Sequence, residues 1–145
     1  MLSRTRFPAL ALLVAGVCLC IGAVQAREKR AKVLEKGQFH NADKTGKGRA
    51  TLYQLADGRR VLRLTHFSVD NGPDLHVRLI AAKDAKDTAS VAKTDHVELG
   101  KLKGNKGSQN YEVPENVDLS KYKVVSIWCN RFSVNFAAAP LKAVK

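Results

Sequence analysis

The chain has 145 residues, of which 25 are Lys or Arg and 13 are Asp or Glu, so its formal net charge is +12 at pH 7. A chain of this length can bury roughly two thirds of the surface that it exposes when unfolded, so it needs no disulfide to fold. The charge favours anionic partners such as membrane surfaces, polysaccharides or nucleic acid. The lysines are scattered along the sequence, however, and a solvated basic surface explains the charge equally well. Met1 is the only methionine, which excludes haem ligated by a methionine.

The N-terminus has the three parts of a secretory signal peptide. The basic head MLSRTR is followed by the uncharged stretch FPALALLVAGVCLCIGAV, and small residues at Val24 and Ala26 precede the charged REKR. We therefore expect residues 1–26 to be cleaved after Ala26, leaving an exported protein, periplasmic or extracellular, with no membrane span. The apolar stretch is close to the roughly 18 residues that can cross a membrane, so an uncleaved anchor is the alternative. Export makes nucleic acid the least expected partner, and none is predicted.

Cleavage would leave 119 residues with a net charge of +10, because the leader carries two of the basic residues and no acidic residue. It would also remove Cys18 and Cys20, so that Cys129 becomes the single cysteine of the mature protein. Exported proteins usually pair their cysteines, and an unpaired one indicates a free thiol or a disulfide between two chains.

Residues 27–36 are predicted to form a charged tail and residues 37–145 a single β domain. Short runs of alternating apolar and polar residues are separated by Gly, Asn, Asp and Pro, and no segment keeps a helical period over three turns. This pattern predicts an all-β fold, an antiparallel β-sandwich or flattened barrel of about seven or eight strands. The polar segment 83–95 is expected to be a mobile surface loop with at most a helical turn. The predicted strands are 33–40, 49–56, 59–69, 74–82, 96–104, 109–114 and the apolar run from 124 onward.

The clearest predicted strand is DLHVRLIAA, residues 74–82. Its alternation predicts one core face and one solvent face. The core face holds Leu75, Val77 and Leu79, and the solvent face holds Asp74, His76 and Arg78. Gly72 and Pro73 directly before the strand predict a tight turn, because Gly tolerates unusual dihedral angles and Pro fixes its own.

The run VVSIWCNRFSVNF, residues 124–136, contains Cys129. Its alternation predicts an aromatic core face that holds Val124, Ser126, Trp128, Phe132, Val134 and Phe136, with Asn130 among them. The other face begins apolar and becomes polar after Cys129, which places the thiol at the edge between buried and wet surface. There the guanidinium of Arg131 is expected to stabilise the thiolate. A buried, inert cysteine is the alternative, and a bulge near Asn130 would reverse every later face.

Signatures of stand-alone enzymes and metal sites are missing from the sequence. The four histidines show no spacing typical of a local ligand pair, there is no C-x-x-C, and no metal site is predicted. There is also no G-x-S-x-G, no H-E-x-x-H and no glycine-rich phosphate loop after a strand. A redox or binding module is therefore favoured over a stand-alone enzyme.

Three stretches resemble the signature blocks of the DM-thirteen domain family, a small extracellular domain named for electron transfer. They are GPDLHVRL (72–79), ELGKLKGNKGSQNYEVP (98–114) and VVSIWCNRFSVNFAAAPL (124–141), and the resemblance extends over residues 37–141. It implies a β-rich module of a cell-surface redox system. In such a module Cys129 would act as a bare thiol or hold a prosthetic group such as haem. The blocks also include Gly72, Pro73, Asp74, Trp128, Phe132 and Phe136.

Two functions follow as hypotheses. The preferred one is an exported electron-transfer domain with a redox-active or ligand-holding Cys129, whose electron partner is a separate protein because this chain carries the domain alone. The alternative is a non-catalytic, basic binding module for an anionic component of the cell envelope, with Cys129 as a structural residue. An accessory role in stress or metal tolerance is a third, weaker hypothesis.

Overall fold

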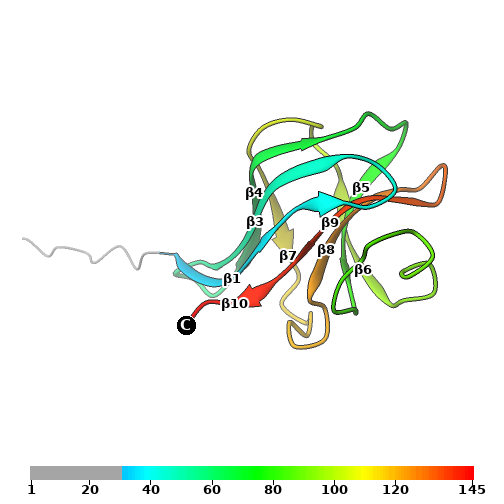
Figure 1. Ribbon diagram of the computed structural model, residues 1–145. Helices are drawn as coiled ribbons and strands as arrows, with labels where there is room; N and C mark the ends of the chain where they lie inside the picture. The colour runs from blue at the N-terminus through cyan, green and yellow to red at the C-terminus, as the bar shows by residue number, and fades with distance from the viewer. Residues whose placement is uncertain (1–30) are drawn as a thin grey trace, which may run out of the picture.

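The computed structural model describes residues 31–145, which form two antiparallel five-stranded sheets packed face to face (Figure 1). Sheet A has the strand order β10-β1-β3-β4-β7, and sheet B has the order β2-β9-β8-β5-β6. The strands are β1 (Lys32–Gln38), β2 (His40–Asn41), β3 (Gly46–Gln54), β4 (Arg60–Val69), β5 (Leu75–Ile80), β6 (His96–Lys101), β7 (Gln109–Val113), β8 (Val124–Cys129), β9 (Val134–Pro140) and β10 (Lys142–Ala143).

The predicted all-β sandwich is confirmed. Eight of the described strands have five or more residues, and β2 and β10 have two residues each. Strand β1 begins at Lys32, one residue before the predicted strand 33–40. Residues 32–36, which the sequence also placed in the charged tail, therefore belong to sheet A. The predicted signal peptide, with Cys18 and Cys20, lies outside the described residues.

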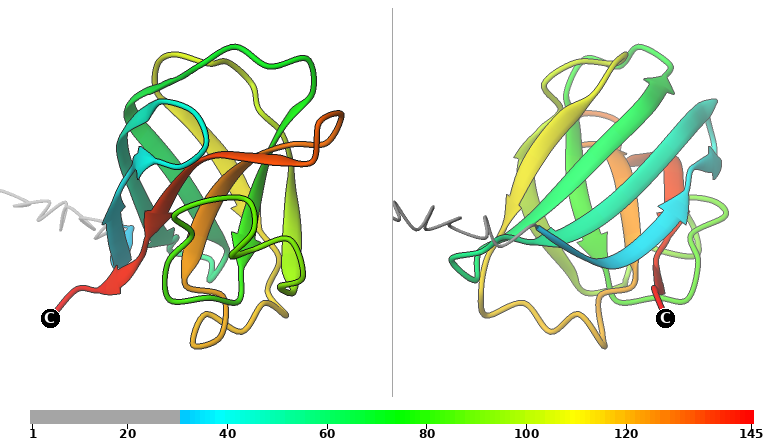
Figure 2. Two further views of the ribbon diagram at one scale, coloured as in Figure 1. Left: turned by 45° about the vertical axis from the view of Figure 1, so that its right-hand side comes forward. Right: turned by 90° about the vertical axis from the view of Figure 1, so that its left-hand side faces the viewer.

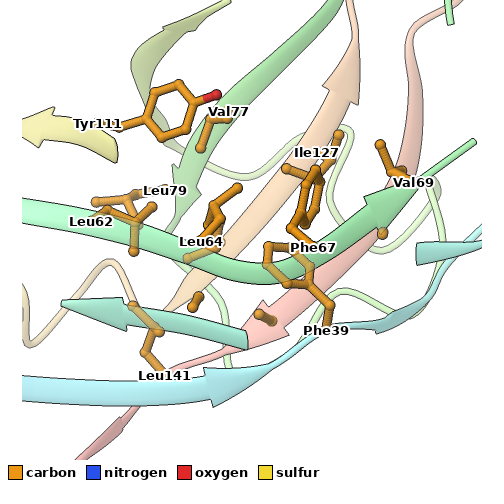
Figure 3. Packing of buried hydrophobic residues seen from close by; sticks show 14 of the residues in the cluster. Phe39, Leu62, Leu64, Phe67, Val69, Val77, Leu79, Tyr111, Ile127 and Leu141 are labelled. Atoms are coloured by element: carbon orange, nitrogen blue, oxygen red, sulfur yellow. The ribbon is translucent and has the colours of Figure 1, made fainter. Parts of the chain in front are cut away.

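The core lies between the inner faces of the two sheets (Figure 3). Strand β5 contributes Leu75, Val77 and Leu79, all buried as the alternation predicted. Strand β4 of the opposite sheet contributes Leu62 and Leu64, neither of which is exposed at all. Because the side chains of a strand alternate between its two faces, these residues all point toward the opposite sheet. There they interdigitate and form one apolar layer.

Strand β8 departs from the prediction, because its inner face is the opposite one. Val125, Ile127 and Cys129 belong to the main core, whereas Val124 and Trp128 lie in a second apolar cluster on the outer face of sheet B. Both faces of β8 are apolar and both are covered, so alternation could not tell the inner face from the outer one. The prediction took the face that contains the aromatic Trp128 as the inner one, and this was wrong.

The segment 83–95 covers that outer face, as a loop without regular secondary structure. Ala85 and Val91 of this loop are buried against the second cluster. The loop is anchored by Asn135 of β9, whose Nδ2 donates to the carbonyl of Ala85 at 3.1 Å and whose backbone N–H donates to Thr88 Oγ1 at 2.8 Å. The backbone N–H of Ala92 donates to the Thr88 carbonyl at 3.0 Å, which gives the single helical turn that the sequence allowed.

An ion pair joins the two sheets of the sandwich. Glu35 of β1 is buried, and one of its carboxylate oxygens accepts a hydrogen bond from Lys123 Nζ, just before β8. The other carboxylate oxygen, Oε2, is buried without a hydrogen-bond partner among residues 31–145. A buried carboxylate is costly unless it is paired, so Glu35 depends on Lys123.

Candidate functional site

Cys129 is the last residue of β8 and is fully buried, with its side chain in the main core. It is a free cysteine, and its neighbours directly across the strands are Leu75 of β5 and Val134 of β9. Directly opposite residues in an antiparallel sheet share a face, so Leu75 and Val134 flank the thiol on the core side. The prediction that Cys129 lies at a wet edge is wrong, because β8 turns its Cys129 face inward.

Gly72 allows the tight packing beside this end of β5. A Cβ placed on Gly72 would lie 2.6 Å from Leu75 Cδ2, closer than real Cβ contacts, and 3.0 Å from Phe136 Cε2, an unusually tight contact. The missing side chain therefore lets Leu75 and Phe136 close over the end of the core. Phe136 is buried in that core, as the sequence predicted.

A cleft of about 260 Å³ opens at the same end of the sandwich. Its walls are the segment before β5 and the segment after β6, and Leu75 forms part of its lining. Leu75 thus lines the cleft and lies directly opposite Cys129. The lining residues are Asn71, Gly72, Pro73, Asp74, Leu75, Lys101, Leu102, Gly104 and Asn105.

Strand β8 ends at Cys129 because the chain makes a tight turn over residues 130–133 before β9. The hairpin formed by β8, this turn and β9 projects from the body of the sandwich (Figures 1 and 2). Ser133 has a positive φ of 53°, a conformation that closes turns. Phe132 is 61% exposed in this turn, so its predicted place in the core is wrong.

Arg131 is exposed in the same turn and has no hydrogen bond or ion pair to another residue of the described part. The Cys129 side chain points into the core instead. The structure therefore does not bring these two residues together in the way that the alternation suggested, and the thiolate-stabilising role of Arg131 stays a prediction.

A polar network covers the outer face of sheet B, on the reverse side from Cys129. His76 contacts Asp74 Oδ1 through Nε2 at 2.9 Å and Glu98 through Nδ1. Arg78 Nε donates to the second oxygen of Glu98 at 3.1 Å, and its Nη2 donates to Asn130 Oδ1 at 2.6 Å. The predicted outward direction of His76 and Arg78 is confirmed, but their partners Glu98 and Asn130 were not foreseen. Only the register of β5 against β6 and β8 brings them into reach.

Trp128 completes this outer surface. The Arg78 guanidinium carbon lies 5.0 Å from the centre of a Trp128 ring, a cation–π geometry. Trp128 lies directly opposite His76 across the strands. Because Trp128 and Cys129 are consecutive in a strand, their side chains lie on opposite faces of sheet B.

The residues around Cys129 bear on whether this part of the protein could hold a metal ion or a haem. Within residues 31–145, no group of three or more His, Cys, Asp and Glu is placed to hold a metal ion. A haem bound by Cys129 would need open space beside the sulfur. Cys129 is instead fully buried among core side chains and is not part of the cleft lining. The residues present therefore do not fit a haem at Cys129. The described part also contains no helix long and apolar enough to cross a membrane.

Comparison with known proteins identifies the domain. A family model described as "Electron transfer DM13" matches residues 38–141, a range that includes the cleft, Cys129 and the hairpin turn. No curated protein and no solved structure matches the chain. The matched range is most of the chain and includes β2 to β9, and the chain therefore belongs to the DM13 electron-transfer family.

Proposed function

We propose that this protein is exported and that its domain carries electrons through the thiol of Cys129. The observation that supports this most directly is the position of Leu75, which lines the cleft and lies directly across the strands from Cys129. Opposite residues of an antiparallel pair have Cβ atoms about 5 Å apart. The sulfur therefore lies about one side chain behind the cleft wall, although no solvent reaches it.

The arrangement suits the transfer of an electron better than the transfer of a group. An electron can cross a packed side chain without contact between donor and acceptor atoms, whereas a covalent attack on sulfur requires access. In the proposed step the thiol of Cys129 is oxidised to a thiyl radical: its S–H bond breaks, a one-electron acceptor takes the electron, and the proton leaves to solvent when the packing over Cys129 opens locally. The acceptor belongs to a separate protein that binds at the cleft, and a one-electron donor restores the thiol.

The cleft is lined by one basic residue, Lys101, and one acidic residue, Asp74. The cleft itself therefore does not strongly favour a partner of either charge. The exposed Phe132 on the neighbouring hairpin offers a single apolar anchor. Aromatic residues are enriched among the side chains that contribute most to protein–protein binding. The hairpin tip and the cleft together are the surface at which we place the electron partner.

The experiment measures electron transfer to ferricyanide from the wild type and from Cys129→Ala. The wild type should reduce about one equivalent per chain, and ascorbate should restore the titratable thiol. The Ala variant keeps every Trp and Tyr, so it controls for oxidation of aromatic side chains, and it should reduce none. Equal reduction by both folded proteins, or none by the wild type, would refute the role of Cys129.

A further inference from the structure

The outer face of sheet A concentrates positive charge. Strand pairing puts the side chains of one cross-strand row on the same side of the sheet, and Lys142, Lys36, Thr51 and Arg63 form such a row. Arg49, opposite Gln38 and Thr65, lies in the next row, and Lys47, opposite Ser68, lies beyond a bulge. We call this surface the basic face, defined by Lys36, Lys47, Arg49, Arg63 and Lys142.

Acidic residues do not balance these cations. Strands β1, β3, β4 and β10 contain one acidic residue, Glu35, whose carboxylate is buried on the inner side and paired with Lys123. Glu112 on the edge strand β7 is the one acidic residue in the rows of this face. Within residues 31–145, none of the five cations of the basic face takes part in an ion pair.

The arrangement opposes folding, which indicates a role other than stability. Lys36 and Lys142 lie directly opposite each other, and like charges in that position destabilise a sheet. Lysine on an edge strand such as β10 commonly blocks pairing between sheets. That reason does not apply to Arg49 and Arg63, which lie on β3 and β4 inside the sheet.

The basic face also has an apolar side. The adjoining cross-strand row consists of Val33, Tyr53 and Val61, and it ends at Glu112 on β7. A shallow cleft of about 200 Å³ opens there, and Tyr53, Leu55 and Val61 line it. Cations next to half-buried apolar and aromatic side chains match the boundary of a bilayer, where phosphate groups meet acyl chains.

We propose that the basic face docks the domain onto an anionic phospholipid surface. The cations spread across roughly 15 Å of sheet, since neighbouring strands lie about 4.8 Å apart. A flat sheet face suits a flat bilayer, whereas a polysaccharide chain would leave the apolar row uncovered. The right-hand view of Figure 2 shows this face toward the reader, with the β8–β9 hairpin on the other sheet. Docking would therefore leave the hairpin free, and the proposal does not depend on electron transfer.

The test compares sedimentation with vesicles of pure phosphatidylcholine and vesicles that contain about 30% phosphatidylglycerol. The full sequence is expressed and the protein is used as the cell processes it, so any contribution of the N-terminus appears with both vesicle types. One variant replaces Lys36, Lys47, Arg49 and Lys142 with Gln. The matched control replaces Lys83, Lys86, Lys93 and Arg131 with Gln; these residues are also exposed but lie outside sheet A and make no pairing with it.

The wild type should bind the anionic vesicles more strongly than the neutral ones, and salt should weaken this binding because exposed charges are screened. Each cation near an anionic surface changes the partition coefficient about fivefold, so the face variant should lose roughly 100-fold or more. The control should lose much less. An equal loss in both variants would show a general charge effect and overturn the proposal. So would binding to an acidic polysaccharide such as alginate without binding to anionic vesicles, or binding to neither.

Discussion

Replacement of Cys129 tests whether its site is a dry part of the core. Cys129 has no exposed surface, and its cross-strand neighbours Leu75 and Val134 are apolar. Cys129→Ala removes one heavy atom and leaves a small cavity, which should cost about 1–2 kcal/mol. Cys129→Ser leaves a polar hydroxyl among apolar side chains, which should cost about 1–3 kcal/mol beyond the loss of the sulfur. The expected order of stability is therefore wild type, then Ala, then Ser.

Urea unfolding measures these free energies, with one shared slope for the three proteins. For a domain of this size, each kcal/mol should lower the thermal midpoint by roughly 4 °C. A Ser variant that is as stable as the wild type, or more stable than the Ala variant, would mean that water reaches residue 129. Stability alone does not decide the redox role, because a buried cysteine should destabilise on replacement whether or not it carries electrons. The ferricyanide measurement supplies that second, independent readout.

Three further predictions concern other parts of the chain. Burial acts to lower the pKa of His40, but its hydrogen bonds to the Asn41 carbonyl and to Asp84 outweigh burial and raise that pKa. The stability that His40 adds should be complete below its ordinary pKa of about 6.5 and should fade as pH rises through the pKa of the folded state. An NMR titration of the ring would check the direction of the shift, and the unfolding of His40→Gln across this pH range would check the stability. Lys123→Met leaves Glu35 buried and unpaired, which should lower the free energy of unfolding by close to the lower end of roughly 3–5 kcal/mol. Adding Glu35→Gln should recover most of that stability. Equal stability of the single and double variants would contradict the ion-pair argument. N-terminal sequencing of the exported protein should start at Arg27, and an intact N-terminus in the membrane fraction would support the anchor instead.

The sequence was sufficient for the fold because most strands have one apolar and one polar face. Strand β5 shows this well, since Leu75, Val77 and Leu79 alternate with half-buried polar residues. Turn residues between such strands indicated where each strand ends, and the positions of six of the eight longer strands, β1 and β3 to β7, followed.

The site was harder to predict because β8 is covered on both sides. Its outer side packs against Ala85 and Val91 of a polar loop whose sequence gave no sign of a covering role. Alternation therefore offered two equivalent core faces and could not place Cys129. Phe132 was misplaced for a different reason, since the hairpin turn interrupts what reads as one apolar run. The polar network of His76 with Glu98 needed the strand register, which a single sequence does not contain.

Burial also explains how one unpaired cysteine can persist in a protein that we propose is exported. An exposed thiol in an oxidising compartment reacts with disulfides or is oxidised, and both reactions require access to the sulfur. Leu75 and Val134 deny that access to Cys129, while the cleft brings an acceptor to within about one side chain. The packing that hinders covalent chemistry at the thiol is thus compatible with the electron exchange that we propose for it. An enlarged opening, as in Leu75→Ala, should speed alkylation of Cys129 more than a destabilising core substitution away from the cleft, such as Leu62→Ala. Equal rates in two variants of equal stability would show that Leu75 does not guard the thiol.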